Sequence, residues 1–82
     1  MIACDRHDYV EIACTFRLPV RLVMEDGAVI DGVALDTGYD DQRQECLMLD
    51  VAGERRAVVL DRIITMTALK TNPHFDTVHL AP

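Results

Sequence analysis

Hydrophobic and polar positions in the first part of the chain follow the period of an α-helix over residues 8–17. The apolar positions share one helix face by their i, i+3, i+4 and i+7 spacing and are Tyr9, Ile12, Ala13 and Phe16. The opposite, polar stripe holds Asp8, Glu11 and Thr15. Asp5 is suited to cap the N-terminus of this helix. Pro19 is expected to end it, because a proline disfavours the helical conformation of the preceding residue.

Further along, the period changes to two, which is the spacing of β-strands whose side chains alternate between faces. Residues 20–25 alternate in this way, and the Asp26-Gly27 pair that follows is a strong hairpin signal. Residues 28–36 contain Gly32, a position at which a strand can bend sharply. The first two strands are therefore predicted to pair antiparallel.

The second half of the chain repeats short strands and tight turns. Residues 37–44 are the most polar stretch and are expected to form an exposed loop, where functional side chains are common. Residues 46–51 and 56–60 flank a second turn that contains glycine, and residues 63–69 supply a fifth strand. Residues 70–82 are expected to contribute at most one further short strand.

Five or six short strands, with a bend in the second and a helix in front, predict a mainly β fold. The expected architecture is a small Sm-like or SH3-like antiparallel barrel with an N-terminal α-helix. An OB-fold is the alternative, but it usually places a helix between its third and fourth strands, where this chain has a short turn around Gly53. No repeat, low-complexity segment or linker divides the chain, so residues 1–82 are predicted to form one domain, with the barrel at about 19–80.

The charge of the chain narrows the choice of partner. The chain has 8 Lys and Arg against 14 Asp and Glu, which gives a formal net charge of −6 at pH 7. A domain that binds nucleic acid through phosphates normally needs a basic face, so the acidic excess favours a basic protein surface as the partner. Solubility alone is the other explanation of the charge.

The sequence predicts neither a membrane protein nor an enzyme. No apolar run is long enough to cross a bilayer, and the N-terminus carries acidic side chains where a signal peptide would carry basic ones, so the expected location is the cytoplasm. The three histidines are dispersed, and no GxSxG, HExxH, phosphate loop or dinucleotide fingerprint occurs. The chain is therefore not expected to be an enzyme, and no cofactor is predicted.

The three cysteines and the adjacent carboxylates Asp40 and Asp41 leave open the hypothesis that the chain binds a metal ion. No CxxC arrangement occurs, and the three cysteines are expected to be reduced, mostly buried thiols. A metal site would have to combine ligands whose spacing matches no familiar pattern: Cys4, His7, Cys14 and Cys46. The Asp40-Asp41 pair is a candidate for a divalent cation, but consecutive carboxylates in a polar loop are far more often solvated.

An acidic helix bounded by cysteines occurs together with a Leu-Asp-Arg-Ile strand end and several smaller motifs. The full set is Cys4-Asp5, Asp8, Glu11-Ile12-Ala13-Cys14, Gly27, Asp36, Ala52-Gly53-Glu54 and Leu60-Asp61-Arg62-Ile63. In this combination the chain resembles the Rof family of Rho-binding antiterminators, which are small modulators of Rho-dependent transcription termination. The likeness covers nearly the whole chain in register.

The resemblance implies an Sm-like barrel preceded by a helix, and a protein that acts by binding. It implies docking on the N-terminal domain of the hexameric Rho helicase, near its primary RNA-binding site, so that RNA loading is blocked and termination is inhibited. The protein is then expected to be a monomer when free and not to bind RNA directly. An acidic protein can occupy a basic RNA-binding surface, because its carboxylates take the place of the negative charges of the RNA phosphates.

By the family's pattern, contacts with Rho come from the N-terminal segment and from the loop between the second and third strands. The expected contact residues are Asp5, His7, Asp8, Tyr9, Glu11, Asp40, Asp41, Gln42, Arg43 and Gln44. Asp8 and Glu11 are the sharpest candidates, because their i, i+3 spacing aligns them on the polar face without an obvious structural demand. Tyr9 suits either packing on the barrel or an interface.

Two other functional classes remain open at this point. An Sm-like RNA-binding module would need a basic patch, which the negative charge of the chain disfavours. A small metal-binding or thiol-redox protein would be distinguished by zinc titration or by counting free thiols.

Overall fold

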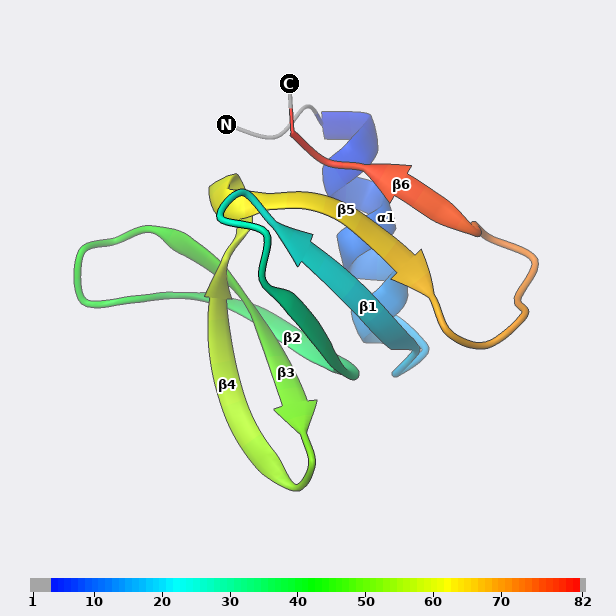
Figure 1. The fold of residues 1–82 in the computed structure, drawn as a ribbon, viewed down its shortest axis with the longest axis horizontal. Coiled ribbons are helices and arrows are strands. Elements are labelled where there is room, and N and C mark those ends of the chain that lie inside the picture. The colour runs from blue at the N-terminus through cyan, green and yellow to red at the C-terminus, as the bar shows by residue number, and fades with distance from the viewer. Residues whose placement is uncertain (1–3, 82) are drawn as a thin grey trace.

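The computed structural model describes the backbone of residues 4–81 and the side chains of residues 6–81. In this part of the chain one helix, α1 (Cys4–Thr15), precedes six strands (Figure 1). The strands are β1 (Pro19–Met24), β2 (Val29–Tyr39), β3 (Glu45–Val51), β4 (Glu54–Val59), β5 (Ile63–Ala68) and β6 (Thr77–His79). A 3₁₀ turn, η1 (Leu60–Arg62), connects β4 to β5 in place of the continuous strand end that the sequence suggested.

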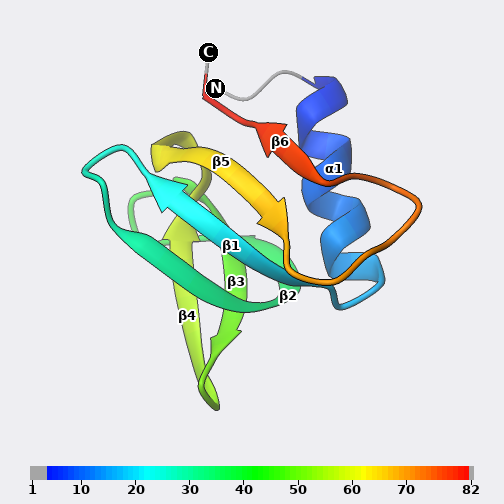
Figure 2. The ribbon, with the colours of Figure 1, turned by 45° about the vertical axis from the view of Figure 1, so that its right-hand side comes forward.

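The six strands form one antiparallel sheet in the order β4-β3-β2-β1-β5-β6. β1 lies near the middle and pairs with β2 on one side and β5 on the other. The sheet curves strongly and stays open, with β4 and β6 as its edge strands (Figure 2). The predicted mainly β architecture with an N-terminal helix is confirmed, and the segment near the C-terminus adds the sixth strand.

β2 is longer than predicted and contains the main irregularity of the sheet. It runs to Tyr39, so the loop before β3 shrinks from residues 37–44 to residues 40–44. The register between β2 and β3 shifts between Ala34 and Asp36, which is a β-bulge. Pairing with β3 continues on both sides of the bulge, so the polar residues near the end of β2 are part of the sheet.

Gly32 is required for the close approach of β2 and β3. A Cβ at this position would lie 2.8 Å from the carbonyl oxygen of Asp50 and 3.1 Å from Cγ2 of Val51. Side-chain Cβ atoms are not tolerated at 2.8 Å from a backbone atom, so only glycine fits without a shift of the strands. The need for glycine at position 32 therefore comes from the close packing of β2 and β3, and its predicted role in bending the strand stays a prediction.

The helix starts earlier than predicted. It begins at Cys4 and ends at Thr15, whereas the hydrophobic period indicated residues 8–17. Asp5 lies within the helix, so its predicted role as N-cap is wrong, and its side chain lies outside the described residues. The first turn is held to the C-terminal segment by Arg6, whose Nη1 donates to the carbonyl of Ala81 at 3.2 Å. This contact between distant parts of the chain has no local sequence signal.

The end of the helix is set by a Schellman motif before Pro19 is reached. The N–H of Leu18 donates to the carbonyl of Ala13 at 2.9 Å, and the N–H of Arg17 donates to that of Cys14 at 3.2 Å. Arg17 takes the left-handed conformation that closes this motif, with φ of 50°. Pro19 is instead the first residue of β1.

The face of α1 that packs on the sheet also differs from the prediction. Val10 and Ala13 are fully buried, whereas Phe16, assigned to the apolar face from its spacing, is 55% exposed. The helix packs against β2 and, less extensively, against β6. The predicted face is therefore confirmed at Ala13 and at Tyr9, which packs against the core, and it is wrong at Phe16. Val10, which the prediction left out, is fully buried instead.

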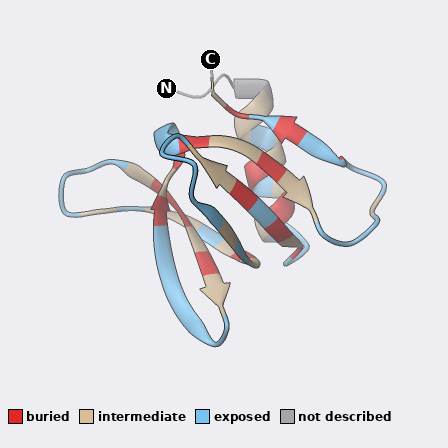
Figure 3. Cartoon of the chain, viewed as in Figure 1, coloured by how far each residue is buried: buried red, intermediate tan, exposed pale blue. Residues whose placement is uncertain are grey.

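The core fills the concave side of the sheet. Buried positions alternate along β1, where Val20 and Leu22 are inside and Arg21 is outside, while the first half of β4 is exposed (Figure 3). On the outer face Arg21 forms a two-bond ion pair with Asp31 at 2.8 and 2.9 Å, which lowers the pKa of Asp31. The buried hydrophobic cluster comprises Val10, Ala13, Leu18, Val20, Leu22, Ala34, Leu47, Leu49, Val58, Leu60, Ile63, Met66, Phe75, Val78 and Leu80.

Replacement of Gly32 tests whether the close approach of β2 and β3 requires glycine at this position. Gly32→Ala should lower the free energy of unfolding by about 1–3 kcal/mol, because the new Cβ meets backbone that cannot move away cheaply. Gly38→Ala is the matched control in the same strand, since its Cβ would meet the flexible end of Met48 at 3.0 Å. Urea denaturation of the two variants checks this, and equal losses at both positions would contradict it.

Candidate functional site

The polar stripe of α1 faces solvent, as the sequence predicted. Asp8 is exposed and takes part in no hydrogen bond or ion pair with the residues that the structure describes. Glu11 is 60% exposed, and its backbone carbonyl accepts a 2.9 Å hydrogen bond from the hydroxyl of Thr15. Both carboxylates are thus displayed on a rigid helix and are available to a partner.

His7 links the helix to the start of β3. Its Nε2 forms a hydrogen bond with Oε2 of Glu45 at 3.0 Å, and its Nδ1 lies 3.5 Å from Oε1 of Glu11. Only 24% of the His7 side chain is exposed, so most of its surface is in contact with the rest of the protein. Because Glu45 directly follows the loop of residues 40–44, His7 connects the acidic stripe to that loop.

Within the loop, Asp40 has a structural role. Its Oδ1 accepts hydrogen bonds from the backbone N–H groups of Gln42 at 2.9 Å and Gln44 at 2.8 Å. The backbone N–H of Arg43 donates to the carbonyl of Asp40, and Arg43 has φ of 61°. Asp40 therefore shapes a turn at whose surface Asp41, Gln42, Arg43 and Gln44 are exposed.

A cavity of about 380 Å³ lies where the helix and the loop meet. It is lined by His7, Tyr39, Arg43, Gln44, Glu45, Leu60 and Asp61. Tyr39 and Glu45 were not among the predicted site residues, although Tyr39 is 70% exposed at the edge of this cavity. An aromatic residue in the most polar stretch of the sequence was the available signal for Tyr39, whereas the role of Glu45 depends on its contact with His7.

Tyr9 lies on the other flank of the helix. Its ring packs edge-on against Phe75, with ring centroids 5.9 Å apart and an interplanar angle of 72°. Phe16, on the same flank, stacks on His74 at 4.8 Å. The structure therefore brings His7 to the loop, with Glu11 in contact with His7, and leaves Tyr9 apart from the loop, against Phe75.

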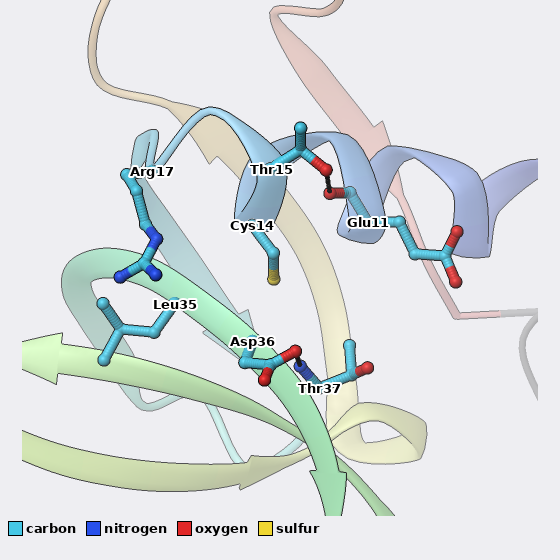
Figure 4. A pocket seen from close by; sticks show the side chains of 7 residues that line it. All are labelled: Glu11, Cys14, Thr15, Arg17, Leu35, Asp36 and Thr37. Carbon is cyan, nitrogen blue, oxygen red and sulfur yellow. Dashed lines mark hydrogen bonds between the residues drawn. The ribbon is translucent and has the colours of Figure 1, made fainter.

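A second cavity, of about 420 Å³, lies between α1 and β2, beside the place where they pack together (Figure 4). Its lining consists of Glu11, Cys14, Thr15, Arg17, Leu35, Asp36 and Thr37. The sulfur of Cys14 points into this space (Figure 4). Burial raises the pKa of the Cys14 thiol to about 11, and the negative charge of Asp36 adds to this effect. The thiol is therefore protonated and weakly nucleophilic at neutral pH.

The other cysteine that the structure describes in full is also a structural thiol. Cys46 is buried in β3, and burial raises its pKa. Both Cys14 and Cys46 are free, in agreement with the expectation of reduced thiols, while the side chain of Cys4 lies outside the described residues. Among the described residues, no group of three or more His, Cys, Asp or Glu side chains is arranged to hold a metal ion.

The fold and the exposed features define a class of protein: a small acidic β protein with an N-terminal helix and a neighbouring polar loop exposed at its surface. The model of the family described as modulator of Rho-dependent transcription termination (ROF) matches residues 1–80. Protein rof of Escherichia coli (strain K12) is 32% identical over 77 residues, which cover 94% of this chain and 86% of that protein. Protein rof of Shigella flexneri matches to the same extent. The chain belongs to the ROF family, which is a family of transcription regulators.

Solved structures agree with this assignment. YaeO bound to magnesium from Vibrio cholerae O395 is 44% identical, with a TM-score of 0.86 over 89% of this chain and 95% of that one. XC5848 from Xanthomonas campestris, a variant of the Sm-like motif, shares 22% identity and has a TM-score of 0.56 over 79% of this chain and 82% of its own. The second likeness supports the Sm-like fold. Among the residues that the structure describes, no helix is long and apolar enough to span a membrane.

The Cys14 thiol predicts a loss of stability at alkaline pH. Its folded pKa of about 11 lies above the ordinary value of 9.0, so its contribution to stability is complete below pH 9 and is lost as pH rises through 11. Thermal unfolding between these pH values should therefore show a falling Tm that Cys14→Ser makes less steep. An identical slope in both proteins would contradict this assignment.

Removal of the His7 side chain should uncouple the helix from the loop. His7→Ala is expected to lower stability by about 1 kcal/mol and to speed hydrogen exchange of residues 40–44, because the link to Glu45 is lost. His79→Ala is the matched control, since His79 is exposed on the distant edge strand β6. Equal exchange rates in the loop of both variants would show that His7 does not support it.

Proposed function

We propose that this protein binds Rho at or near the primary RNA-binding site on the N-terminal domain of that hexamer, and that it inhibits termination by keeping RNA from loading. It acts in the cytoplasm as a monomer and by binding, without catalysing a reaction or contacting RNA itself. Membership of the ROF family supports Rho as the target.

The observation that carries the proposal is the display of two exposed carboxylates on the solvent side of a helix that is packed on the core. Asp8 and Glu11 lie on the solvent side of α1, whose opposite side is anchored in the core by Val10 and Ala13. Because the helix is fixed before binding, little conformational entropy is lost when these carboxylates meet a partner. A surface that binds RNA phosphates offers the arginine and lysine side chains that would pair with them.

The loop of residues 40–44 supplies the second part of the proposed interface. The Asp40 turn holds the loop in one conformation, and the hydrogen bond between His7 and Glu45 holds it beside the helix. The exposed loop side chains are Asp41, Gln42, Arg43 and Gln44, with Tyr39 at their base. An exposed tyrosine is a frequent anchor at protein interfaces, so Tyr39 joins the proposed contact residues.

Other predicted contacts take lesser roles in this proposal. His7 is mainly a link between the two parts of the interface, and Asp40 is mainly a turn residue. Tyr9 packs against Phe75 on the far flank. The acidic charge of the whole chain, −6, further favours encounter with a basic surface and makes the association dependent on salt.

The direct test is co-migration of the purified protein with Rho in gel filtration, followed by competition against a fluorescent cytosine-rich RNA on the same hexamer. Binding of the protein together with release of the RNA is expected. Binding without release of RNA would overturn the proposed mechanism while leaving Rho as partner. No binding by the folded protein at micromolar concentration would overturn the proposal as a whole.

Reversal of charge on the helix tests the assigned surface. The double variant Asp8→Lys/Glu11→Lys should keep the fold, because both side chains face solvent, and should weaken binding to Rho by at least about tenfold at low salt. Glu54→Lys on the exposed edge strand β4 is the control for nonspecific charge effects. An unchanged affinity of the double variant would remove α1 from the interface.

A further inference from the structure

The cavity between α1 and β2 adjoins the acidic stripe but is not used by the proposed interface. It shares Glu11 with that stripe and continues inward to Cys14 and Asp36 (Figure 4). Asp36 is placed here by the bulge in β2, which interrupts the regular pairing with β3 just before it. A residue remote from the helix in sequence thus adds a second carboxylate to the cavity that Glu11 lines.

The two carboxylates are free to accept hydrogen bonds from a partner. Oδ1 of Asp36 accepts the backbone N–H of Thr37 at 2.8 Å, which fixes the orientation of the side chain and leaves Oδ2 without a hydrogen bond among the described residues. The Glu11 carboxylate contacts His7 only at 3.5 Å and is 60% exposed. The cavity therefore presents one oriented carboxylate, that of Asp36, and one exposed carboxylate, that of Glu11.

The charge of the cavity favours a single cation. Its lining contains the carboxylates of Glu11 and Asp36 and one guanidinium, that of Arg17, so its formal charge is −1. These three charges act on the thiol of Cys14: those of Asp36 and Glu11 raise its pKa, and that of Arg17 lowers it. Arg17 is held at the end of the helix by the Schellman motif, so its charge bounds one end of the cavity.

We propose that this cavity receives one arginine side chain of the partner protein, with its guanidinium between Glu11 and Asp36. Leu35 and Cys14 supply the less polar wall along which the aliphatic stem of an arginine lies. A planar guanidinium donates to two carboxylates at once, which a compact ammonium group does less well. The inference rests on the proposed function, in which the partner is Rho, and it adds Asp36 as a residue that selects the partner.

Asp36→Asn tests the cavity separately from the acidic stripe. The amide oxygen keeps an acceptor for Thr37, so the fold is expected to remain, which denaturation of the variant verifies. Loss of the charge should weaken binding to Rho about tenfold, a change typical of a partly desolvated charge pair. Glu54→Gln removes the same charge from exposed β4, and its effect should stay within about twofold, as expected for a remote surface charge.

Alanine substitution of exposed arginines on the N-terminal domain of Rho identifies the occupant. One such substitution should weaken binding of the wild-type protein and have little further effect on the Asp36→Asn variant, which is the signature of a coupled pair. In the same complex, alkylation of Cys14 should be slowed, since the arginine stem covers the thiol.

The outcomes distinguish this inference from the proposed function. If the wild-type protein binds Rho and displaces RNA, but Asp36→Asn and Glu54→Gln bind equally well, the arginine subsite is overturned and the proposed function stands. Coupling of Asp36 to a lysine of Rho, with none to any arginine, would overturn the assignment of the occupant. Failure of the wild-type protein to bind Rho would overturn both.

Discussion

The burial of Val10 and Ala13 against the curved sheet is the constraint on which the recognition surface depends. These two residues fix the rotation of α1 about its axis, and the rotation decides which of its side chains reach solvent. The helix then has two unlike flanks. One flank packs aromatic residues against the segment that carries Phe75, and the other places His7 and Cys14 beside β2 and β3.

The shape of β2 determines what the second flank of the helix meets. Gly32 allows β2 and β3 to approach closely, and the bulge that follows shifts the register before Asp36. The strand then continues to Tyr39, so the loop of residues 40–44 emerges next to the first half of α1. The acidic stripe, the loop and the cavity between them are thus products of one irregular strand and one packed helix.

Much of the fold was predictable because its signals are local. Alternation along residues 20–25 and the glycines at residues 27 and 53, which both have positive φ, specified the hairpins. Errors arose where distant contacts compete with a local signal. The helical period alone favoured a face containing Phe16, but the core lies nearer Val10. Likewise Pro19 was expected to stop the helix, whereas hydrogen bonds that the backbone N–H groups of Leu18 and Arg17 donate stop it earlier.

The sequence by itself determined the mainly β class, the acidic character and the exposed carboxylates Asp8 and Glu11, because strand alternation, turn chemistry and charge are properties of short segments. Only the tertiary structure decided that His7 joins Glu45, that Asp40 builds a turn and that Asp36 faces Cys14 across a cavity. These relations join residues whose separation along the chain carries no periodic signal. They exist because the packing of α1 on β2 brings the side chains together.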